Sequence, residues 1–124
     1  DYGFIRCNFP NGDMVGHTGV MEAVVSSMES LDACLAEIEA AAKRLGYTLL
    51  ITADHGNADQ MTETKKGKTS IRTAHSLNPV PFIVCDATET YTLKDGAYGL
   101  ANVAPTVATL LQIPAPDCWE ASMI

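Results

Sequence analysis

The sequence is poor in basic residues. Its 124 residues include 8 Lys and Arg against 15 Asp and Glu, which gives a formal net charge of -7. Non-specific binding to nucleic acid requires a basic surface, so this composition argues against a nucleic-acid-binding protein. The same acidity would repel an anionic substrate unless metal ions, or basic residues from elsewhere, reverse the local field.

Long apolar runs and closely spaced cysteines are also missing. The apolar segments are short and interrupted by polar residues, so we expect neither a membrane span nor a signal peptide. The cysteines form no C-x-x-C pair, which argues against a zinc ribbon or a redox pair. Three of the four cysteines lie in apolar segments and are expected in the core, namely Cys7, Cys34 and Cys85. The fourth, Cys118, does not lie in such a segment. Reduced, structural thiols favour a cytoplasmic protein.

The composition that remains is that of a globular protein. Hydrophobic residues make up 47% of the chain and charged residues 19%, enough apolar content for one modest domain with one core. The sequence begins with Asp1 rather than Met, within an apolar segment. We therefore expect a piece of a longer protein, in which residues 1–124 form one portion of a domain without an internal boundary.

The first half of the chain predicts a strand, a helix and a second strand. Phe4–Asn8 is a short apolar run that ends in the turn sequence of residues 10–12. Apolar residues then recur at spacings of three and four over residues 20–45, and Gly46 supplies a stop. The continuous apolar run of residues 47–53 predicts a buried strand. The helix stripe consists of Val20, Val24, Met28, Leu31, Leu35, Ile38 and Leu45.

This order predicts a βαβ unit with two parallel strands. In a parallel pair both carboxyl ends lie at one edge of the sheet, where open α/β sheets bind their ligands. The loop of residues 10–17 is therefore expected to emerge beside the loop of residues 54–57.

The second half contains a polar segment, a strand and a helix. Residues 57–80 are expected to form a hairpin or an irregular loop. Residues 80–85 predict a third strand, which we expect to run antiparallel to the other two. Asn102 is the expected N-cap of a last helix that tolerates Pro105 in its first turn.

Five residues form a candidate metal site that includes every histidine of the chain. Carboxylate oxygen and neutral imidazole suit manganese, zinc, cobalt or iron, and magnesium where oxygen dominates. Two of them are four residues apart and would share a helix face, although the glycines around them favour a loop at a helix entrance. The five are Asp13, His17, Asp54, His55 and His75.

Each candidate also has a plainer interpretation. Asp13 suits a turn, Asp54 could cap a turn with His55 as its neighbour, and His75 could be an ordinary loop residue. The expected convergence of two loops at one sheet edge favours the metal site. Lysine and arginine side chains at residues 65–72 could grip phosphate, but such a run is more often a solvated turn. No serine lies in a G-x-S-x-G motif, so no nucleophile is evident.

Three stretches closely resemble motifs of the cofactor-independent phosphoglycerate mutases, members of the alkaline phosphatase superfamily. They are NFPNGDMVGHTG, ITADHGNADQMT and TAHSLNPVPFIV, and they follow the family's order. The later ANVAPTVATLLQI resembles the family's closing helix. The resemblance covers nearly the whole chain and corresponds to the C-terminal part of a much longer protein. It implies an α/β fold, the alkaline-phosphatase-like three-layer α/β/α sandwich, of which residues 1–124 would supply the C-terminal portion.

The resemblance also implies two divalent metal ions, manganese first, with magnesium or cobalt as alternatives, and no 2,3-bisphosphoglycerate. By motif, Asp13, His17 and His75 would hold one ion. Asp54 and His55 would hold the other, together with an Asp and a Ser from the upstream part. That upstream Ser would be the nucleophile, so this chain is expected to contain no catalytic nucleophile and to be inactive alone.

The implied activity is the interconversion of 3-phosphoglycerate and 2-phosphoglycerate through a phosphoserine intermediate, a step of glycolysis and gluconeogenesis. The implied partners are the phosphoglycerate substrate and the remainder of the same polypeptide, with no nucleic acid and no membrane. Metal-dependent phosphatases, phosphodiesterases and phosphopentomutases of the same superfamily are alternatives. A non-catalytic, metal-stabilised module is a further alternative.

Overall fold

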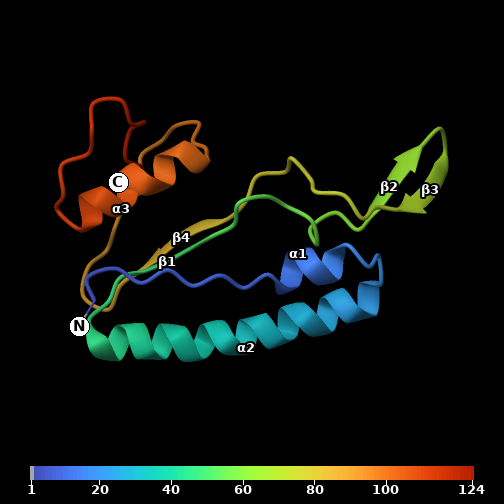
Figure 1. The fold of residues 1–124 in the computed structure, drawn as a ribbon, viewed down its shortest axis with the longest axis horizontal. Helices are drawn as coiled ribbons and strands as arrows, with labels where there is room; N and C mark the ends of the chain where they lie inside the picture. Colours follow the sequence, from blue (N-terminus) through green and yellow to red (C-terminus); the bar gives the residue numbers. More distant parts are fainter. Residues whose placement is uncertain (1) are drawn as a thin grey trace. The chain divides into compact units, whose positions relative to one another are not determined.

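The computed structural model describes residues Tyr2–Ile124 and divides the chain into two compact units. One unit is Cys7–Ala87. The other combines the described residues Tyr2–Arg6 with Thr88–Ile124. Figure 1 shows the helices and strands of both units. That residues 1–124 form one portion of a single domain without an internal domain boundary stays a prediction.

The long helix of the first unit confirms the sequence prediction. α2 spans Met21–Leu45 (Figure 1) and has Glu22 in its first turn and basic residues in its last, as the helix dipole favours. Gly46 ends the helix in the left-handed conformation with φ 73°, and the Tyr47 N–H donates to the Ala42 carbonyl at 2.9 Å. This is the glycine-dependent helix end that the sequence predicted.

The apolar stripe of α2 is covered only in part. Val24 is buried, whereas Val20 and Leu45 are 53% and 64% exposed. Other members of the stripe, Leu31, Leu35 and Ile38, are half-buried. Buried apolar side chains include Val24 and Met61 in this unit and Pro105, Ala108 and Met123 in the other.

A short helix precedes α2, where a loop was favoured. α1 spans Asn11–Gly16, and its first hydrogen bond runs from the Met14 N–H to the Pro10 carbonyl at 2.8 Å. α1 packs against α2, and Gly12 of α1 lies beside the Met28 side chain of α2. Packing against a neighbouring helix therefore overrides the low helix propensity of the two glycines.

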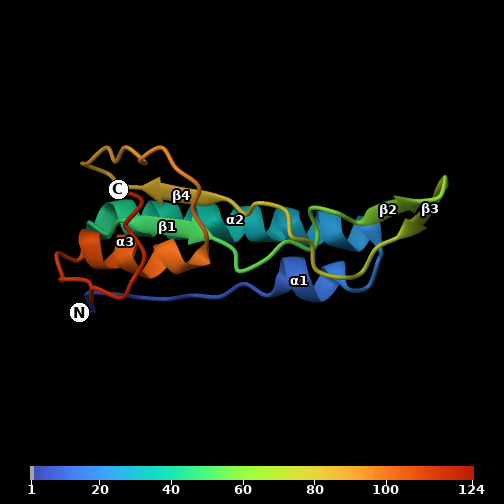
Figure 2. The same cartoon turned by 90° about the horizontal axis from the view of Figure 1, so that it is seen from above.

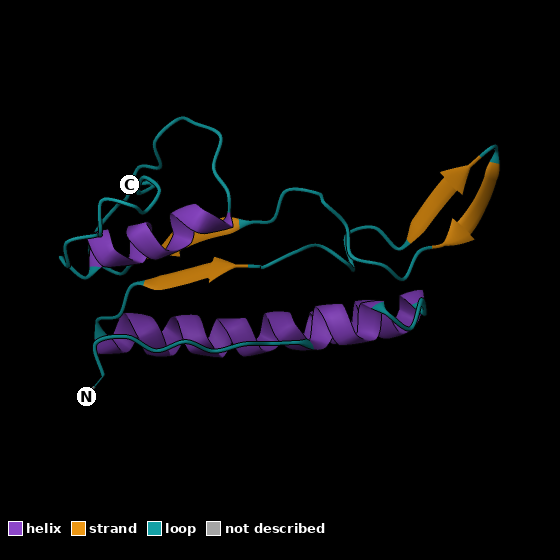
Figure 3. Ribbon diagram, turned by 45° about the horizontal axis from the view of Figure 1, so that its top comes forward, coloured by secondary structure: helices purple, strands orange, loops and turns teal. Residues whose placement is uncertain are grey.

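The strands of this unit form two antiparallel pairs (Figures 2 and 3). β1, Leu49–Thr52, pairs with β4, Phe82–Cys85, so the predicted antiparallel direction of the later strand is confirmed with respect to β1. β2, Thr62–Lys65, and β3, Lys68–Ile71, form the hairpin that was one of two expectations for the polar segment. The hairpin turn has positive φ at Lys66 (50°) and Gly67 (75°), which suits the twist of the strands.

The predicted strand Phe4–Asn8 is wrong, and with it the parallel βαβ unit. These residues are described, form no strand, and expose Phe4 and Ile5 by 58% and 63%. A strand requires a neighbouring ladder, and the described strands pair only as β1 with β4 and β2 with β3. The parallel sheet edge that was to join the two loops is therefore absent from the described residues.

The cysteine prediction is partly wrong. All four cysteines are free, but Cys7 and Cys34 are exposed rather than in the core, and Cys85 in β4 is half-buried. Cys34 borders an open, mainly apolar hollow together with Phe9 and Ile38. The apolar neighbours in the sequence were a poor guide because they do not close over these thiols.

The second unit contains the 3-10 helix η1, Leu100–Asn102, and α3, Val103–Leu110. Asn102 precedes α3, as predicted, but its side chain does not cap that helix. Its amide oxygen instead accepts from the Gly99 N–H and its nitrogen donates to the Ala121 carbonyl, both at 2.8 Å. Among the described residues, no helix combines the length and apolar character that crossing a membrane requires.

Candidate metal centre

Asp13 and His17 meet on one side of α1. His17 is the C-cap residue and keeps a helical conformation, with its N–H donating to the Asp13 carbonyl at 3.1 Å. Residues four apart on a helix face each other. The Asp13 Oδ1 atom accordingly lies 3.2 Å from His17 Nε2. The helix thus presents a carboxylate and an imidazole as a pair.

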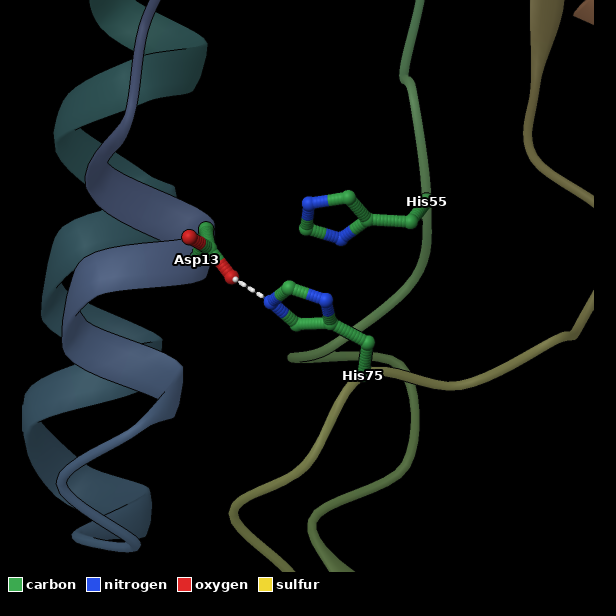
Figure 4. A group of neighbouring side chains, drawn as sticks. All are labelled: Asp13, His55 and His75. Atoms are coloured by element: carbon green, nitrogen blue, oxygen red, sulfur yellow. Dashed lines mark ion pairs between the residues drawn. The ribbon is translucent and has the colours of Figure 1, made fainter.

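Two further imidazoles approach this pair, His55 from the segment after β1 and His75 from the segment between β3 and β4, and Figure 4 shows both beside Asp13. His75 Nε2 lies 3.0 Å from Asp13 Oδ1 and 3.2 Å from His17 Nε2. The His55 ring stacks on the His75 ring, with centroids 3.7 Å apart and an angle of 18° between the planes. Asp13, His55 and His75 offer ligand atoms that all lie within 4.8 Å of one another.

The spacing of three donor atoms fits a divalent metal ion. Asp13 Oδ1, His17 Nε2 and His75 Nε2 form a triangle with sides of 3.2, 3.0 and 3.2 Å. Donors bound at about 2.1 Å lie about 3.0 Å apart at a right angle and about 3.4 Å apart at the tetrahedral angle. One carboxylate oxygen and two imidazole nitrogens also suit the chemistry of first-row transition metals.

A backbone carbonyl fixes the tautomer of His17. The Nδ1 atom lies 2.6 Å from the Thr73 oxygen. A carbonyl oxygen only accepts, so Nδ1 carries the hydrogen and Nε2 is the nitrogen turned toward Asp13. A hydrogen bond of this kind orients an imidazole for metal binding.

Asn57 supports Asp13, and the sequence reasoning missed it. Its Nδ2 atom donates to Asp13 Oδ1 at 2.9 Å and to the Asp13 carbonyl at 3.3 Å, and the residue is only 5% exposed. A Cβ at Gly16 would overlap the Asn57 amide, so this approach requires glycine there. The Asn57 amide lowers the pKa of Asp13 below 3.8, burial opposes the shift, and the three imidazoles lower the pKa further. Asp13 is therefore ionised at neutral pH, as a carboxylate that binds a metal ion must be.

Replacing Asn57 with Ala is expected to raise the pKa of Asp13 toward 3.8, because the largest cause of the lowered value is lost. The ¹³C shift of the Asp13 carboxyl, followed through an acid titration of the metal-free protein, measures this. The lowered pKa of Glu63 arises chiefly from Lys65 and should not change, so it serves as an internal control. An unchanged Asp13 titration would contradict the role given to Asn57.

Asp54 lies apart from the donor triangle. Its side chain is 85% exposed, and its Oδ1 atom is 3.7 Å from His55 Nε2. The Asp54–His55 pair is therefore open to solvent on the Asp54 side. A metal site that takes further ligands from another segment would be open in this way. The structure brings Asp54 and His55 to the same region as the other three candidates.

The basic cluster divides into two kinds of residue. Lys65, Lys66 and Lys68 are exposed on the β2–β3 hairpin. Arg72 is half-buried and donates to the His75 carbonyl at 2.5 Å, with Glu63 3.5 Å away. Arg72 therefore supports the loop that carries His75, a role that the spacing of basic residues did not indicate.

The chain as a whole matches a known class of protein. The chain matches the family model described as "Metalloenzyme superfamily" over residues 1–115. The chain therefore belongs to the Metalloenzyme superfamily, and the alkaline-phosphatase-like fold class expected from the sequence is confirmed.

Within this superfamily its homologues are 2,3-bisphosphoglycerate-independent phosphoglycerate mutases, which confirms the resemblance. The one from Enterobacter sp. (strain 638) is 46% identical over 115 residues, which are 93% of this chain and 22% of the relative. The one from Photobacterium profundum is 47% identical over 116 residues, which are 94% of this chain and 22% of the relative. This chain spans about a fifth of the length of these curated relatives.

A solved structure agrees with these relatives. The structure of Leishmania mexicana phosphoglycerate mutase at low cobalt concentration superposes with a TM-score of 0.86 and 37% sequence identity. The match covers 94% of this chain and 24% of that chain.

Proposed function

We propose that this chain is the C-terminal, metal-binding portion of a 2,3-bisphosphoglycerate-independent phosphoglycerate mutase, which interconverts 3-phosphoglycerate and 2-phosphoglycerate. The observation that carries the proposal is the donor triangle of Asp13, His17 and His75, with sides of 3.0 to 3.2 Å. It occurs in a chain whose homologues are such mutases.

The proposal assigns two divalent ions, manganese first, with magnesium or cobalt as alternatives. Asp13, His17 and His75 hold one ion. Asp54 and His55 contribute to the other, which an Asp and a Ser from an upstream segment complete. When bound, the ions supply activation of the serine hydroxyl and neutralisation of the charge on the transferring phosphoryl group.

The residues of this chain prepare the site and do not perform the nucleophilic attack. Asp13 supplies negative charge, because its lowered pKa keeps the carboxylate ionised. His17 presents Nε2, because Thr73 holds the hydrogen on Nδ1. The serine nucleophile and the basic residues that grip the substrate lie outside this chain. Its partners are accordingly the phosphoglycerate substrate and the remainder of the same polypeptide.

A cytoplasmic location is part of the proposal. All four cysteines are free, and Cys7, Cys34 and Cys118 are exposed. Exposed free thiols persist in a reducing compartment, whereas oxidising compartments favour disulfides.

The proposed distribution of metal ligands and nucleophile between this chain and the upstream part predicts how the chain behaves alone. One proposed site has three of its ligands here and the other only two, so the 124-residue chain is expected to bind one Mn²⁺ appreciably more tightly than a second. It is expected to show no mutase activity, because the nucleophile is missing. Calorimetric titration with Mn²⁺ measures the first expectation, and a phosphoglycerate assay measures the second.

The complete polypeptide tests the function itself. It is expected to interconvert the two phosphoglycerates without added 2,3-bisphosphoglycerate and to lose this activity on chelation. Release of inorganic phosphate without isomerisation would identify a phosphatase instead. Tight metal binding without turnover of any phosphoester would identify a non-catalytic module.

A further inference from the structure

A backbone contact beside the two histidines joins the loops that carry His55 and His75. Gly56 and Ser76 form an isolated antiparallel bridge, in which the Ser76 N–H donates to the Gly56 carbonyl at 2.8 Å. Each bridge residue directly follows one of the histidines. The bridge therefore sets the two imidazoles side by side, and their rings stack with centroids 3.7 Å apart.

Asp59 reinforces this bridge from one loop to the other. Its Oδ2 atom accepts from Ser76 Oγ at 2.8 Å and from Asn78 Nδ2 at 2.6 Å. Ser76 is only 2% exposed, so its hydroxyl has a protein partner instead of bulk water. A Cβ at Gly56 would overlap both Ser76 Oγ and the Asp59 carboxylate, so the glycine permits their close approach.

The carboxylate of Asp59 is ionised, which strengthens these contacts. Burial raises its pKa, but hydrogen bonds from Asn78, Ser76 and the backbone outweigh that effect, and the pKa lies below 3.8. Hydrogen bonds to an ionised acceptor are shorter and roughly twice as strong as neutral ones. Oδ2 accepts from Ser76 and from Asn78, so Asp59 acts on the His75 loop through these two residues and lies against Gly56 of the His55 loop.

We infer that Asp59, Ser76 and Asn78 form a clasp that holds the His55 loop against the His75 loop and so positions both imidazoles for metal binding. The inference rests on the proposed metal site and adds positioning residues that do not bind the ion themselves. Residues that orient ligands in this way typically change metal affinity by about 10- to 100-fold when they are replaced.

The test compares Asp59→Ala with Asp32→Ala in the complete polypeptide. Asp32 is an exposed acid on α2, away from both loops in sequence, and matches the change in net charge. Asp59→Ala is expected to weaken Mn²⁺ binding by about 10- to 100-fold. Asp32→Ala is expected to leave it unchanged. Calorimetry gives the affinity, and the visible spectrum of the Co²⁺-loaded protein reports whether the ligand geometry has changed.

Two further measurements separate positioning from general stability. The melting temperature of each metal-free variant shows whether the fold persists. Asn78→Ala removes one of the hydrogen-bond donors to Asp59 at an exposed position. It replaces Asp59→Ala as the test variant if Asp59→Ala fails to fold. A double-mutant cycle between Asp59→Ala and Ser76→Ala should be strongly non-additive, because either change opens the same clasp.

Three outcomes would overturn the inference. In the first, folded Asp59→Ala, or folded Asn78→Ala in its place, binds Mn²⁺ as tightly as Asp32→Ala. In the second, affinity falls only in proportion to a lower metal-free melting temperature, with an unchanged Co²⁺ spectrum. In the third, the unaltered protein binds no Mn²⁺, which removes the proposed metal site together with its clasp. Only the third outcome affects the proposed function.

Discussion

Asp13→Asn is expected to weaken Mn²⁺ binding at the tighter site by at least about 100-fold, more than the loss of an orienting residue causes. The carboxylate oxygen Oδ1 lies 3.2 Å from His17 Nε2 and 3.0 Å from His75 Nε2, and is the only anionic corner of the donor triangle. The amide keeps the shape and removes the charge. It also places a neutral group where Asn57 donates a hydrogen bond at 2.9 Å.

Calorimetric titration of the 124-residue chain with Mn²⁺ measures this effect. Asp32→Asn on α2 is the matched control and should bind as the unaltered chain does, since Asp32 is an exposed helix residue. If Asp13→Asn kept the original affinity, the ion would not bind at this triangle. A loss of binding in both variants would point to non-specific attraction by the acidic surface.

Asp54→Asn is expected to lower the turnover of the complete polypeptide by about 100-fold or more, given the several kcal/mol that a bound metal charge contributes to catalysis. Asp54 is proposed to hold the ion that activates the upstream serine. Its side chain is 85% exposed in this chain, so the substitution should leave the fold intact. The variant therefore separates a role in the site from a role in stability. Steady-state phosphoglycerate turnover and metal content are the two measurements.

Lys68→Ala provides the control for Asp54→Asn. Lys68 is exposed on the β2–β3 hairpin, and its replacement should change turnover little if the hairpin lysines are solvated. Near-normal turnover and normal metal content in Asp54→Asn would remove Asp54 from the site. A large loss in Lys68→Ala would instead give the hairpin a role in holding the anionic substrate.

Local patterns in the sequence predicted the elements that depend on nearby residues. The spacing of apolar residues and the terminal Gly46 located α2, because helix periodicity and a left-handed cap are properties of a single segment. The run before Ala53 located β1, and the run before Asp86 located β4. The hairpin at Lys66-Gly67 was one of two local expectations.

Predictions that depended on distant residues failed. Phe4–Asn8 has the composition of a strand but no ladder among the described residues. Gly12 and Gly16 favoured a loop, yet α1 forms because it packs on α2. A single sequence gives the preference of a segment and does not state which neighbour will be present to override it.

The convergence of the two loops was anticipated for a reason that the structure does not support. A parallel sheet edge was expected to bring residues 10–17 beside residues 54–57. A side-chain contact performs this task instead, since Asn57 reaches Asp13, and His17 in turn reaches the Thr73 carbonyl of the segment that carries His75. Neither contact has a period or a fixed spacing in the sequence from which it could be read.

The sequence alone determined the chemistry available to the centre, because carboxylate and imidazole side chains are metal ligands wherever a fold places them, and their motifs carried the family resemblance. The tertiary structure decided which donor atoms meet. It set Asp13 against His17 and His75, chose Nδ1 of His17 as the protonated nitrogen, and joined the histidine loops through Asp59. Donor distances near 3 Å depend on backbone positions that many remote contacts fix together, and no local pattern encodes them.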